Sequence, residues 1–178
     1  MILNYLTNCK VLSTVTQEQD EEQWLKNRMQ GIGGSDIGAI CGVNKYMSPR
    51  LLYLIKTGQY EMPISKESKE RMYWGRIHEP IIANEFAKRT NKIIQESPAT
   101  LQHKDYPWAI ANVDRFIVDE QGRPYGVLEC KTADWRLNKD WEEGEIPRSY
   151  IYQIMWYLWI TGLEYGAFAA LIGGNKFY

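Results

Sequence analysis

The sequence predicts one domain of the mixed α/β (α+β) class, because runs with the patterns of strands and of helices both occur along its 178 residues. The clearest sign is a pair of apolar runs, 113–118 and 125–132, on either side of a polar turn with Gly and Pro, which is typical of a β-hairpin. Segments of helical length precede this hairpin, and an apolar helix and an apolar strand follow it. With 44% apolar residues, the chain can bury a sizeable core.

The first part of the chain is expected to contain short helices. Residues 1–15 show no clear pattern, and we expect them to form an N-terminal extension. Thr16 and Gln19 have the spacing of a capping box, which predicts a helix that ends before Gly31. Another helix is expected to begin at Ser48, because an N-cap serine there precedes a proline at the first helical position.

A glycine-rich segment, residues 31–38 (GIGGSDIG), follows the first expected helix. Glycines let the backbone approach a ligand closely, and Arg28 and Ser35 could donate hydrogen bonds to an anion, so one interpretation is a phosphate site. The other is a turn between two helices in which Ser35 is the N-cap of the second. No Gly-Lys-Ser/Thr follows, so the segment is not a Walker A loop.

A long helix is expected from about Lys66 to Thr90. Its buried side is predicted to consist of Met72, Ile77, Ile81, Ile82 and Phe86. Glu79 lies close to that side and directly precedes Pro80, where the helix is expected to start afresh or to kink. Such a carboxylate needs a partner, and two interpretations stay open: a metal-bound water or the active-site lysine, or the dipole at a helix start.

The predicted hairpin carries three charged residues that are suited to metal chemistry. Glu129 and Lys131 are two apart on one strand and therefore share a face, while Cys130 points away. Asp114 on the other strand can pair across onto that face. Two carboxylates beside an ammonium suit a magnesium ion and an activated water, but an ordinary salt bridge on a solvated strand face has the same spacing.

The remaining segments are expected to be strands at 92–96, 100–103 and 165–172, a loop or short irregular helix at 133–147, and a helix at 150–161. The last strand should lie inside the sheet, because it is apolar throughout. The helix at 150–161 is apolar nearly all round except for Gln153. That amide either satisfies a backbone group in the core or points into a catalytic cleft.

Charge is distributed unevenly, although the formal net charge is only −1. Residues 1–92 hold 13 Lys and Arg against 10 Asp and Glu (+3), and residues 93–178 hold 8 against 12 (−4). The acidic half contains the expected metal site, so the basic half is expected to supply phosphate contacts to DNA. Lys45, Arg50 and Lys56 are expected to face solvent or DNA.

The three cysteines, Cys9, Cys41 and Cys130, are widely separated and odd in number, which argues against a disulfide framework or a cysteine zinc site. The cytosol is therefore the expected compartment. The most apolar run, Ile151 to Ile160, is too short to span a bilayer, so no membrane association is expected.

Five motifs in the expected order make the chain resemble a known family. They are Arg28 with GIGGSDI at 31–37, WGRIHEP at 74–80, NVD at 112–114, LECKT at 128–132 and YIYQ at 150–153. From about residue 20 onward, their order and spacing resemble the YqaJ-like viral recombinase family, whose best-known relative is lambda exonuclease.

The resemblance implies a fold and a metal site. The fold is that of the PD-(D/E)XK nuclease superfamily, a restriction-endonuclease-like mixed central β-sheet flanked by helices, with residues 1–178 as one nuclease domain. Asp114, Glu129 and the main-chain carbonyl of Cys130 are implied as ligands of Mg²⁺, for which Mn²⁺ can substitute. Lys131 is implied to act on the attacking water.

The resemblance also assigns residues around that centre. It implies Glu79 as a helix-borne acid near the metal ions and Gln153 as the motif glutamine near Lys131. Arg28 and Ser35 are implied to lie at the 5′-phosphate end of the DNA.

The activity implied by the resemblance is processive digestion of one strand of linear duplex DNA from its 5′ end, which leaves a 3′ overhang for a single-strand annealing protein. The lambda member is a ring-shaped trimer, so a homo-oligomer in the bacterial cytoplasm, encoded by a phage or prophage, is expected. The chain ends at Tyr178, where relatives usually continue, so the C-terminal part of the family fold is expected to be absent. Alternatives are an endonuclease of the same superfamily or a non-catalytic module that binds DNA or protein.

Overall fold

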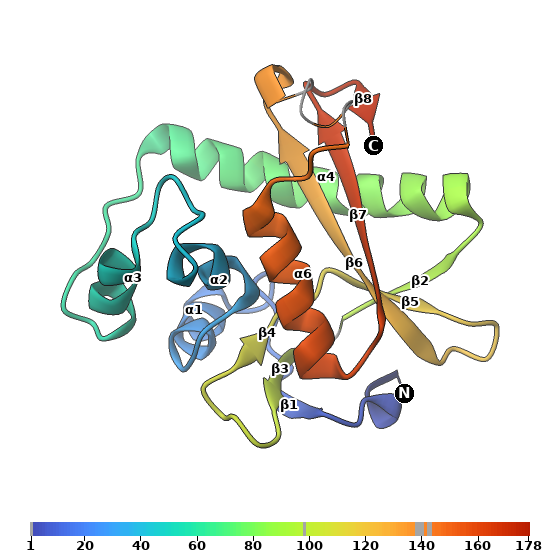
Figure 1. Cartoon of the computed structure of the whole chain (residues 1–178), viewed down its shortest axis with the longest axis horizontal. Helices are drawn as coiled ribbons and strands as arrows, with labels where there is room; N and C mark the ends of the chain where they lie inside the picture. Colours follow the sequence, from blue (N-terminus) through green and yellow to red (C-terminus); the bar gives the residue numbers. More distant parts are fainter. Residues whose placement is uncertain (1, 98, 138–140, 142–143) are drawn as a thin grey trace.

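The computed structural model describes residues 2–97, 99–137, 141 and 144–178. Among these residues the strands form two sheets, one in the order β1-β3-β4 and one in the order β2-β5-β6-β7-β8 (Figure 1). The strands are β1 (Cys9–Ser13), β2 (Ile93–Glu96), β3 (Thr100–His103), β4 (Ile110–Ala111), β5 (Arg115–Val118), β6 (Pro124–Ala133), β7 (Tyr165–Ile172) and β8 (Lys176–Phe177). The helices are η1 (Ile2–Tyr5), α1 (Glu21–Met29), α2 (Gly34–Ile40), α3 (Pro49–Lys56), α4 (Lys66–Thr90), η2 (Trp135–Leu137) and α6 (Arg148–Thr161).

The expected hairpin is confirmed as β5 and β6, which pair antiparallel with Phe116 opposite Val127. β6 also pairs with β7 in parallel, with Glu129 opposite Phe168, so the sheet is mixed. β7 lies inside the sheet as expected, but it is not the last strand, because β8 follows it and pairs with its end. In the stretch 133–147, η2 agrees with the expected irregular helix, while residues 138–140, 142 and 143 lie outside the described residues.

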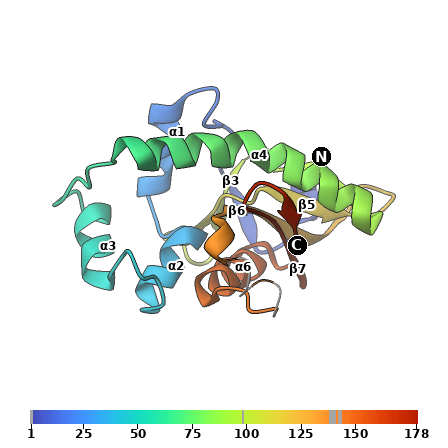
Figure 2. The ribbon, with the colours of Figure 1, turned by 90° about the horizontal axis from the view of Figure 1, so that it is seen from above.

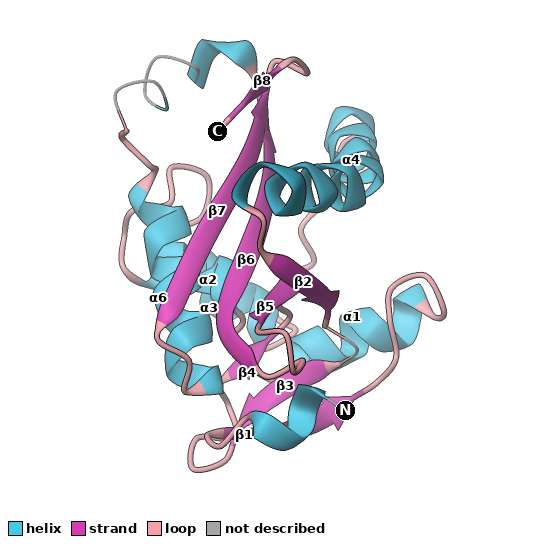
Figure 3. Ribbon diagram, turned by 90° about the vertical axis from the view of Figure 1, so that its right-hand side faces the viewer, coloured by secondary structure: helices cyan, strands magenta, loops and turns pink. Residues whose placement is uncertain are grey.

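Helices cover both faces of the five-stranded sheet, α4 on one side and α6 on the other (Figure 3). Successive residues of a strand point to opposite faces, and the two cores divide the hairpin accordingly. The core under α4 includes Ile82, Phe86, Ile117 and Leu128, and the core under α6 includes Ile154, Tyr157, Phe116 and Val127. The predicted mixed α/β architecture with flanking helices is therefore confirmed.

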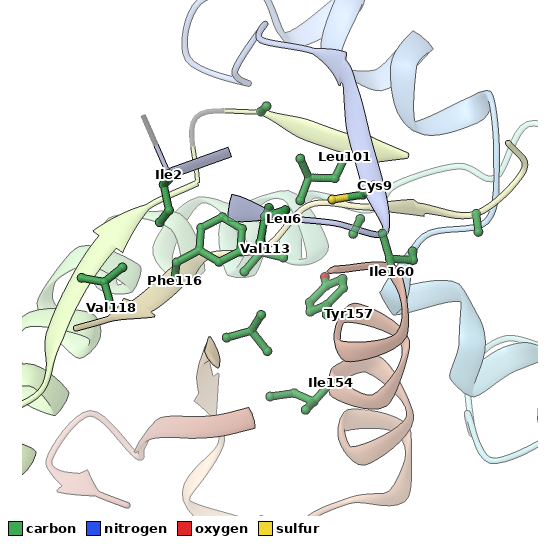
Figure 4. Packing of buried hydrophobic residues seen from close by; sticks show 14 residues of the cluster. Ile2, Leu6, Cys9, Leu101, Val113, Phe116, Val118, Ile154, Tyr157 and Ile160 are labelled. Atoms are coloured by element: carbon green, nitrogen blue, oxygen red, sulfur yellow. The ribbon is translucent and has the colours of Figure 1, made fainter. Parts of the chain in front are cut away.

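The N-terminal residues are part of the core, whereas the sequence predicted an extension without pattern. β1 pairs antiparallel with β3, with Lys10 opposite Gln102. Ile2, Leu6 and Cys9 are buried beside residues of β3, β5 and α6 (Figure 4). A five-residue strand is too short for its alternation to stand out in the sequence.

The first helix begins later than the capping box predicted. Thr16 and Gln19 do exchange the expected side-chain to backbone hydrogen bonds, of 3.1 and 3.4 Å, but within a turn before the helix. The N-cap of α1 is Asp20, whose carboxylate accepts a hydrogen bond from the N–H of Gln23. Ser48 is the N-cap of α3, as predicted.

α4 is one continuous helix of 25 residues that contains Pro80, so the expected restart is wrong. Its N-terminal half reaches beyond the sheet (Figures 1 and 2), and Met72 and Ile77, which were predicted to be buried, are exposed there. Ile81 was also predicted to be buried, but it is exposed although the next residue, Ile82, is not. Ile82 and Phe86 are buried as predicted, because they lie over the sheet. No helix in the described part of the chain is long and apolar enough to cross a membrane.

Candidate active site

A cleft of about 590 Å³ lies where the N-terminal helices meet the five-stranded sheet. All seven side chains predicted for the site line it: Arg28, Ser35, Glu79, Asp114, Glu129, Lys131 and Gln153. A second pocket, of about 260 Å³, adjoins the cleft and shares Glu79 and Asp114 with it. The structure therefore brings together residues that are up to 125 positions apart in the sequence, from position 28 to position 153.

The sequence suggested that Asp114 lies within a strand, but in the structure it lies immediately before β5. The hydrogen-bonded pairing of β5 with β6 ends at Arg115 and Leu128, so Asp114 stands beside the next part of β6. There its Oδ2 accepts a hydrogen bond of 2.8 Å from the backbone N–H of Cys130. The irregular backbone before β5 thus places the carboxylate against the edge of β6 that β5 leaves open.

Glu129 and Lys131 contact each other on one face of β6, as the two-residue spacing predicted. The ammonium of Lys131 donates to Glu129 Oε1 at 2.5 Å and to Gln153 Oε1 at 3.2 Å. Glu129 is only 3% exposed, and its second oxygen, Oε2, is buried without a protein partner. A buried carboxylate oxygen without a partner is unfavourable, which indicates that a ligand belongs there.

The pKa values of Asp114 and Glu129 also indicate that a ligand belongs at this place. Burial raises the pKa of Asp114 well above its usual value, and the nearby charges of Glu129 and Glu79 raise it further. Burial also raises the pKa of Glu129, although Lys131 opposes that shift. A cation placed between the two carboxylates would reverse these shifts by stabilising both charges.

Lys131 is held as an ammonium in this arrangement. Burial lowers the pKa of Lys131, but the carboxylates of Glu129 and Asp114 outweigh that effect, so its pKa lies above the usual value. The ammonium also lies 4.9 Å from the ring centre of Tyr150. In this form Lys131 is a donor that orients acceptors and not a proton acceptor.

Gln153 points into the cleft, which decides between the two interpretations of its amide. Its Nε2 donates to Glu129 Oε1 at 2.6 Å and to the hydroxyl of Tyr157 at 2.9 Å. Tyr157 is a site residue that sequence analysis missed. The available signal was its position one turn after Gln153 on the same helix face.

Glu79 has a different partner from the two that the sequence suggested. Its Oε1 accepts a hydrogen bond of 2.7 Å from Arg115, whose side chain is 10% exposed and also donates to the backbone oxygen of Asp114. The partner is therefore neither the active-site lysine nor a helix start, and the contact with a metal-bound water stays a prediction. Arg115 was not predicted, because nothing local in the sequence separates it from a surface arginine.

Arg28 and Ser35 lie side by side in the same cleft. The guanidinium of Arg28 donates to the hydroxyl of Ser35 at 3.1 Å and stacks 4.6 Å from the ring centre of Trp24. The N-cap of α2 is Gly33, and Ser35 is inside the helix, so its predicted role as an N-cap is wrong. Its hydroxyl is thereby left exposed and free to bind a ligand beside Arg28.

The donor set fits a magnesium ion. N–H and C=O of one strand residue point to the same side, so the carbonyl of Cys130 lies on the side of Asp114, to which its N–H is bound. Asp114, Glu129 and this carbonyl then offer oxygen ligands, as Mg²⁺ prefers. Within the described residues no three His, Cys, Asp or Glu side chains are arranged to hold one ion, since Glu79 is turned to Arg115. Such a site suits an ion that keeps several waters.

Comparison with solved structures shows the same fold in an exonuclease. The alkaline exonuclease LHK-Exo from Laribacter hongkongensis matches with a TM-score of 0.66 and 17% identity, covering 88% of this chain and 79% of that chain. LHK-Exo in complex with dAMP matches with a TM-score of 0.65 and 18% identity over the same shares. At these identities the likeness shows the fold alone.

Sequence comparison identifies the family. A curated protein of Bacillus subtilis (strain 168), named "Uncharacterized protein YqaJ", is 46% identical over 162 residues, which cover 90% of this chain and 49% of that protein. The chain therefore spans about half the length of this relative. The family described as "YqaJ-like viral recombinase domain" matches residues 23–164. Both matches extend over most of the chain and include every residue of the candidate active site between Arg28 and Gln153, so the protein belongs to the YqaJ-like viral recombinase domain family.

Proposed function

We propose that this protein is a metal-dependent deoxyribonuclease that digests one strand of linear double-stranded DNA from its 5′ end. The observation that carries the proposal is the cluster of Asp114, Glu129 and Lys131 in the cleft, with Glu129 Oε2 buried and without a protein partner. The fold shared with an alkaline exonuclease supports the reaction class.

Each residue has a task in the proposed mechanism. Asp114, Glu129 and the carbonyl of Cys130 hold Mg²⁺, for which Mn²⁺ can substitute, with Glu79 as a further acid nearby. The bound ion would polarise the scissile phosphate and lower the pKa of a water. Lys131 orients the attacking water through its ammonium, and Gln153 fixes the positions of both Lys131 and Glu129.

The end of the DNA is proposed to lie toward Arg28. The guanidinium of Arg28 and the hydroxyl of Ser35 would bind the 5′-terminal phosphate, in the same cleft as the carboxylates. We further propose that the protein works in phage-type recombination in the bacterial cytoplasm, with a single-strand annealing protein that receives the 3′ overhang. A homo-oligomer, such as a trimer, would keep it on the DNA.

The test uses a linear duplex with a 5′-phosphate and a different label on each strand, incubated with Mg²⁺ or with chelator. Loss of the 5′-ended strand only with Mg²⁺ is the expected result. Lys131→Ala should abolish cleavage and keep DNA binding, whereas Lys104→Ala, which removes an exposed lysine outside the cleft, should cut like the original protein. Normal cleavage by Lys131→Ala would refute the mechanism.

A closed circular duplex distinguishes the alternatives. An enzyme that needs a DNA end leaves the circle intact, while an endonuclease of the same superfamily cuts it. DNA binding without any cleavage, at all Mg²⁺ and Mn²⁺ concentrations, would instead identify a non-catalytic binding module.

A further inference from the structure

Lys56 makes an unusual set of contacts for a lysine that the sequence placed on the surface. Its ammonium donates to the backbone oxygens of Arg28 and Gly31, both at 2.9 Å, and forms an ion pair of 2.7 Å with Asp36. An ammonium has three N–H donors, and these three acceptors use all of them. The side chains of Lys56 and Asp36 are each only 16% exposed, so the expectation that Lys56 faces solvent or DNA is wrong.

These contacts join the segments that carry the two proposed phosphate-binding side chains. Arg28 lies in the last turn of α1, and Ser35 lies in the first turn of α2. Asp36 Oδ2, besides its bond to Lys56, accepts a hydrogen bond of 2.8 Å from the N–H of Gly33. One side chain from the end of α3 thus holds the end of α1, the glycine turn and the start of α2 together.

The other side of the glycine turn has its own attachment, which does not involve Lys56. The N–H of Ile32 donates to the backbone oxygen of Trp108 at 2.7 Å, and the N–H of Ile110 donates to that of Ile32 at 2.9 Å. Loss of Lys56 would therefore leave the middle of the turn in place. The carbonyls of Arg28 and Gly31 would no longer be bonded to the same side chain as Asp36 at the start of α2.

We propose that Lys56 is a positioning residue that determines the preference for a phosphate at the DNA end, by holding Arg28 and Ser35 within hydrogen-bonding distance of each other. This rests on the proposed function, since it deepens the role of Arg28 and Ser35 in binding the 5′-phosphate. Lys56 itself takes no part in the reaction. Its effect should therefore appear in the binding of phosphorylated ends more than in the rate of cleavage.

The test compares KM and kcat on two linear duplexes that differ only in a 5′-phosphate or a 5′-hydroxyl. Lys56→Met keeps the length of the side chain and removes the charge, and it should raise KM for phosphorylated ends by about 10- to 100-fold, as a misplaced binding group does. The change in kcat should be much smaller, so the preference for phosphorylated over hydroxyl ends collapses. Lys104→Met, a matched removal of an exposed lysine that does not line the cleft, should keep the full preference.

Conservative variants separate positioning from general damage to the fold. Lys56→Arg keeps the charge, but the donors of a planar guanidinium cannot reach all three acceptors that surround the single nitrogen of Lys56, so an intermediate preference is expected. Asp36→Asn removes the ion pair from the other side and should shift KM in the same direction as Lys56→Met. A variant that loses activity equally on both kinds of DNA end would show a merely structural role and overturn the proposal, as would an unchanged preference in Lys56→Met.

Amide hydrogen exchange makes the outcome independent of nuclease activity. The N–H of Gly33 and the amides of 34–36 should exchange faster in Lys56→Met than in Lys104→Met, and equal exchange would overturn the anchoring role. If the original protein cuts neither DNA end, the proposed function fails, and exchange alone decides whether Lys56 anchors the segment. If it cuts both ends equally well, the role in phosphate preference is refuted while the nuclease assignment stands.

Discussion

Gly34→Ala should both destabilise the protein and disturb its proposed catalytic centre. A Cβ atom at Gly34 would lie 2.5 Å from Cε1 of Tyr157 and 3.0 Å from Cγ of Gln153, distances at which atoms overlap. Tyr157 is only 4% exposed, and its ring lies in the core under α6, so it cannot move aside freely. α2 therefore needs glycine here in order to approach α6 closely.

The magnitude follows from two opposing effects. Overpacking a core costs about 1–3 kcal/mol, and an overlap with a buried ring belongs near the upper end of that range. Replacement of glycine by alanine returns about 0.5–1 kcal/mol, because it restricts the unfolded chain. The net loss of about 2 kcal/mol corresponds to a decrease in Tm of about 4–8 °C for a domain of this size.

Gly75→Ala is the matched control. Gly75 is also a helical glycine that lines the cleft, but a Cβ there would meet only Thr132 Oγ1, at an ordinary 3.8 Å. Gly75→Ala should raise Tm slightly, because alanine favours the helix and restricts the unfolded chain more than glycine does. No atomic overlap opposes these two effects. The two alanine variants therefore differ in the sign of their effect on Tm.

Thermal unfolding in chelator measures the change in stability, and this measurement does not depend on the proposed nuclease function. Nuclease assays in Mg²⁺ measure the catalytic part, because Gln153 is bound to both Glu129 and Lys131 and its displacement should lower kcat by about tenfold or more. If Gly34→Ala melts at or above the Tm of the original protein, the packing argument is wrong.

Three further predictions concern the charges and thiols. Because the pKa of Asp114 is raised in the folded state, its ionised carboxylate lowers the stability of the protein at pH values above that pKa. Asp114→Asn should therefore increase Tm in chelator at pH 7.5, and the increase should vanish as the pH falls toward the ordinary pKa of 3.8. A difference in Tm that does not depend on pH would contradict this prediction. Mg²⁺ should raise the Tm of the original protein through binding to the folded state, but it should not raise that of Glu129→Gln, and an equal shift in both would place the ion elsewhere. Burial raises the pKa of the Cys9 thiol to about 11, while Cys41 is exposed, so alkylation at pH 8 followed by mass spectrometry should label Cys41 first and Cys9 only after unfolding.

The candidate active site could be found from the sequence because strand geometry is local. Two residues on one strand share a face when they are two apart, so Glu129 and Lys131 had to meet, and the hairpin brought Asp114 near them. Gln153 was recognised as an exception on an apolar helix, but only the structure shows that it faces Glu129. The metal assignment itself stays a prediction.

Two cations whose roles the sequence analysis did not recognise, Lys56 and Arg115, depend on distant partners. Lys56 bonds to acceptors 25 and 28 positions earlier, and Arg115 pairs with Glu79, which is 36 positions earlier. No local pattern distinguishes such a cation from one on the surface. The missing information was the tertiary packing of short helices against one another.

The long helix shows the opposite error. Met72, Ile77 and Ile81 were predicted on the buried side, yet they are exposed. Met72 and Ile77 lie in the N-terminal half of α4, which extends past the sheet that buries Ile82 and Phe86, whereas Ile81 lies over the sheet but on another side of the helix than Ile82. Periodicity indicates which residues share a helix face but not how far the supporting sheet extends. The same limit explains why β1, whose partner β3 lies about ninety residues later, was predicted as an extension.

The uneven charge of the chain acquires a physical meaning in the cleft. Asp114, Glu129 and Glu79 would repel a DNA phosphate, and Lys131 and Arg115 are already paired with Glu129 and Glu79. Three more cations line the same cleft, and all come from the first half of the chain: Arg28, Lys69 and Arg76. The first half can therefore attract DNA without an ion, while a phosphate can enter the acidic centre only with a cation that offsets its charge. DNA binding in chelator should accordingly depend on Arg28, Lys69 and Arg76. The close packing of Gly34 against Gln153 fixes the start of α2 relative to the residues proposed to cut.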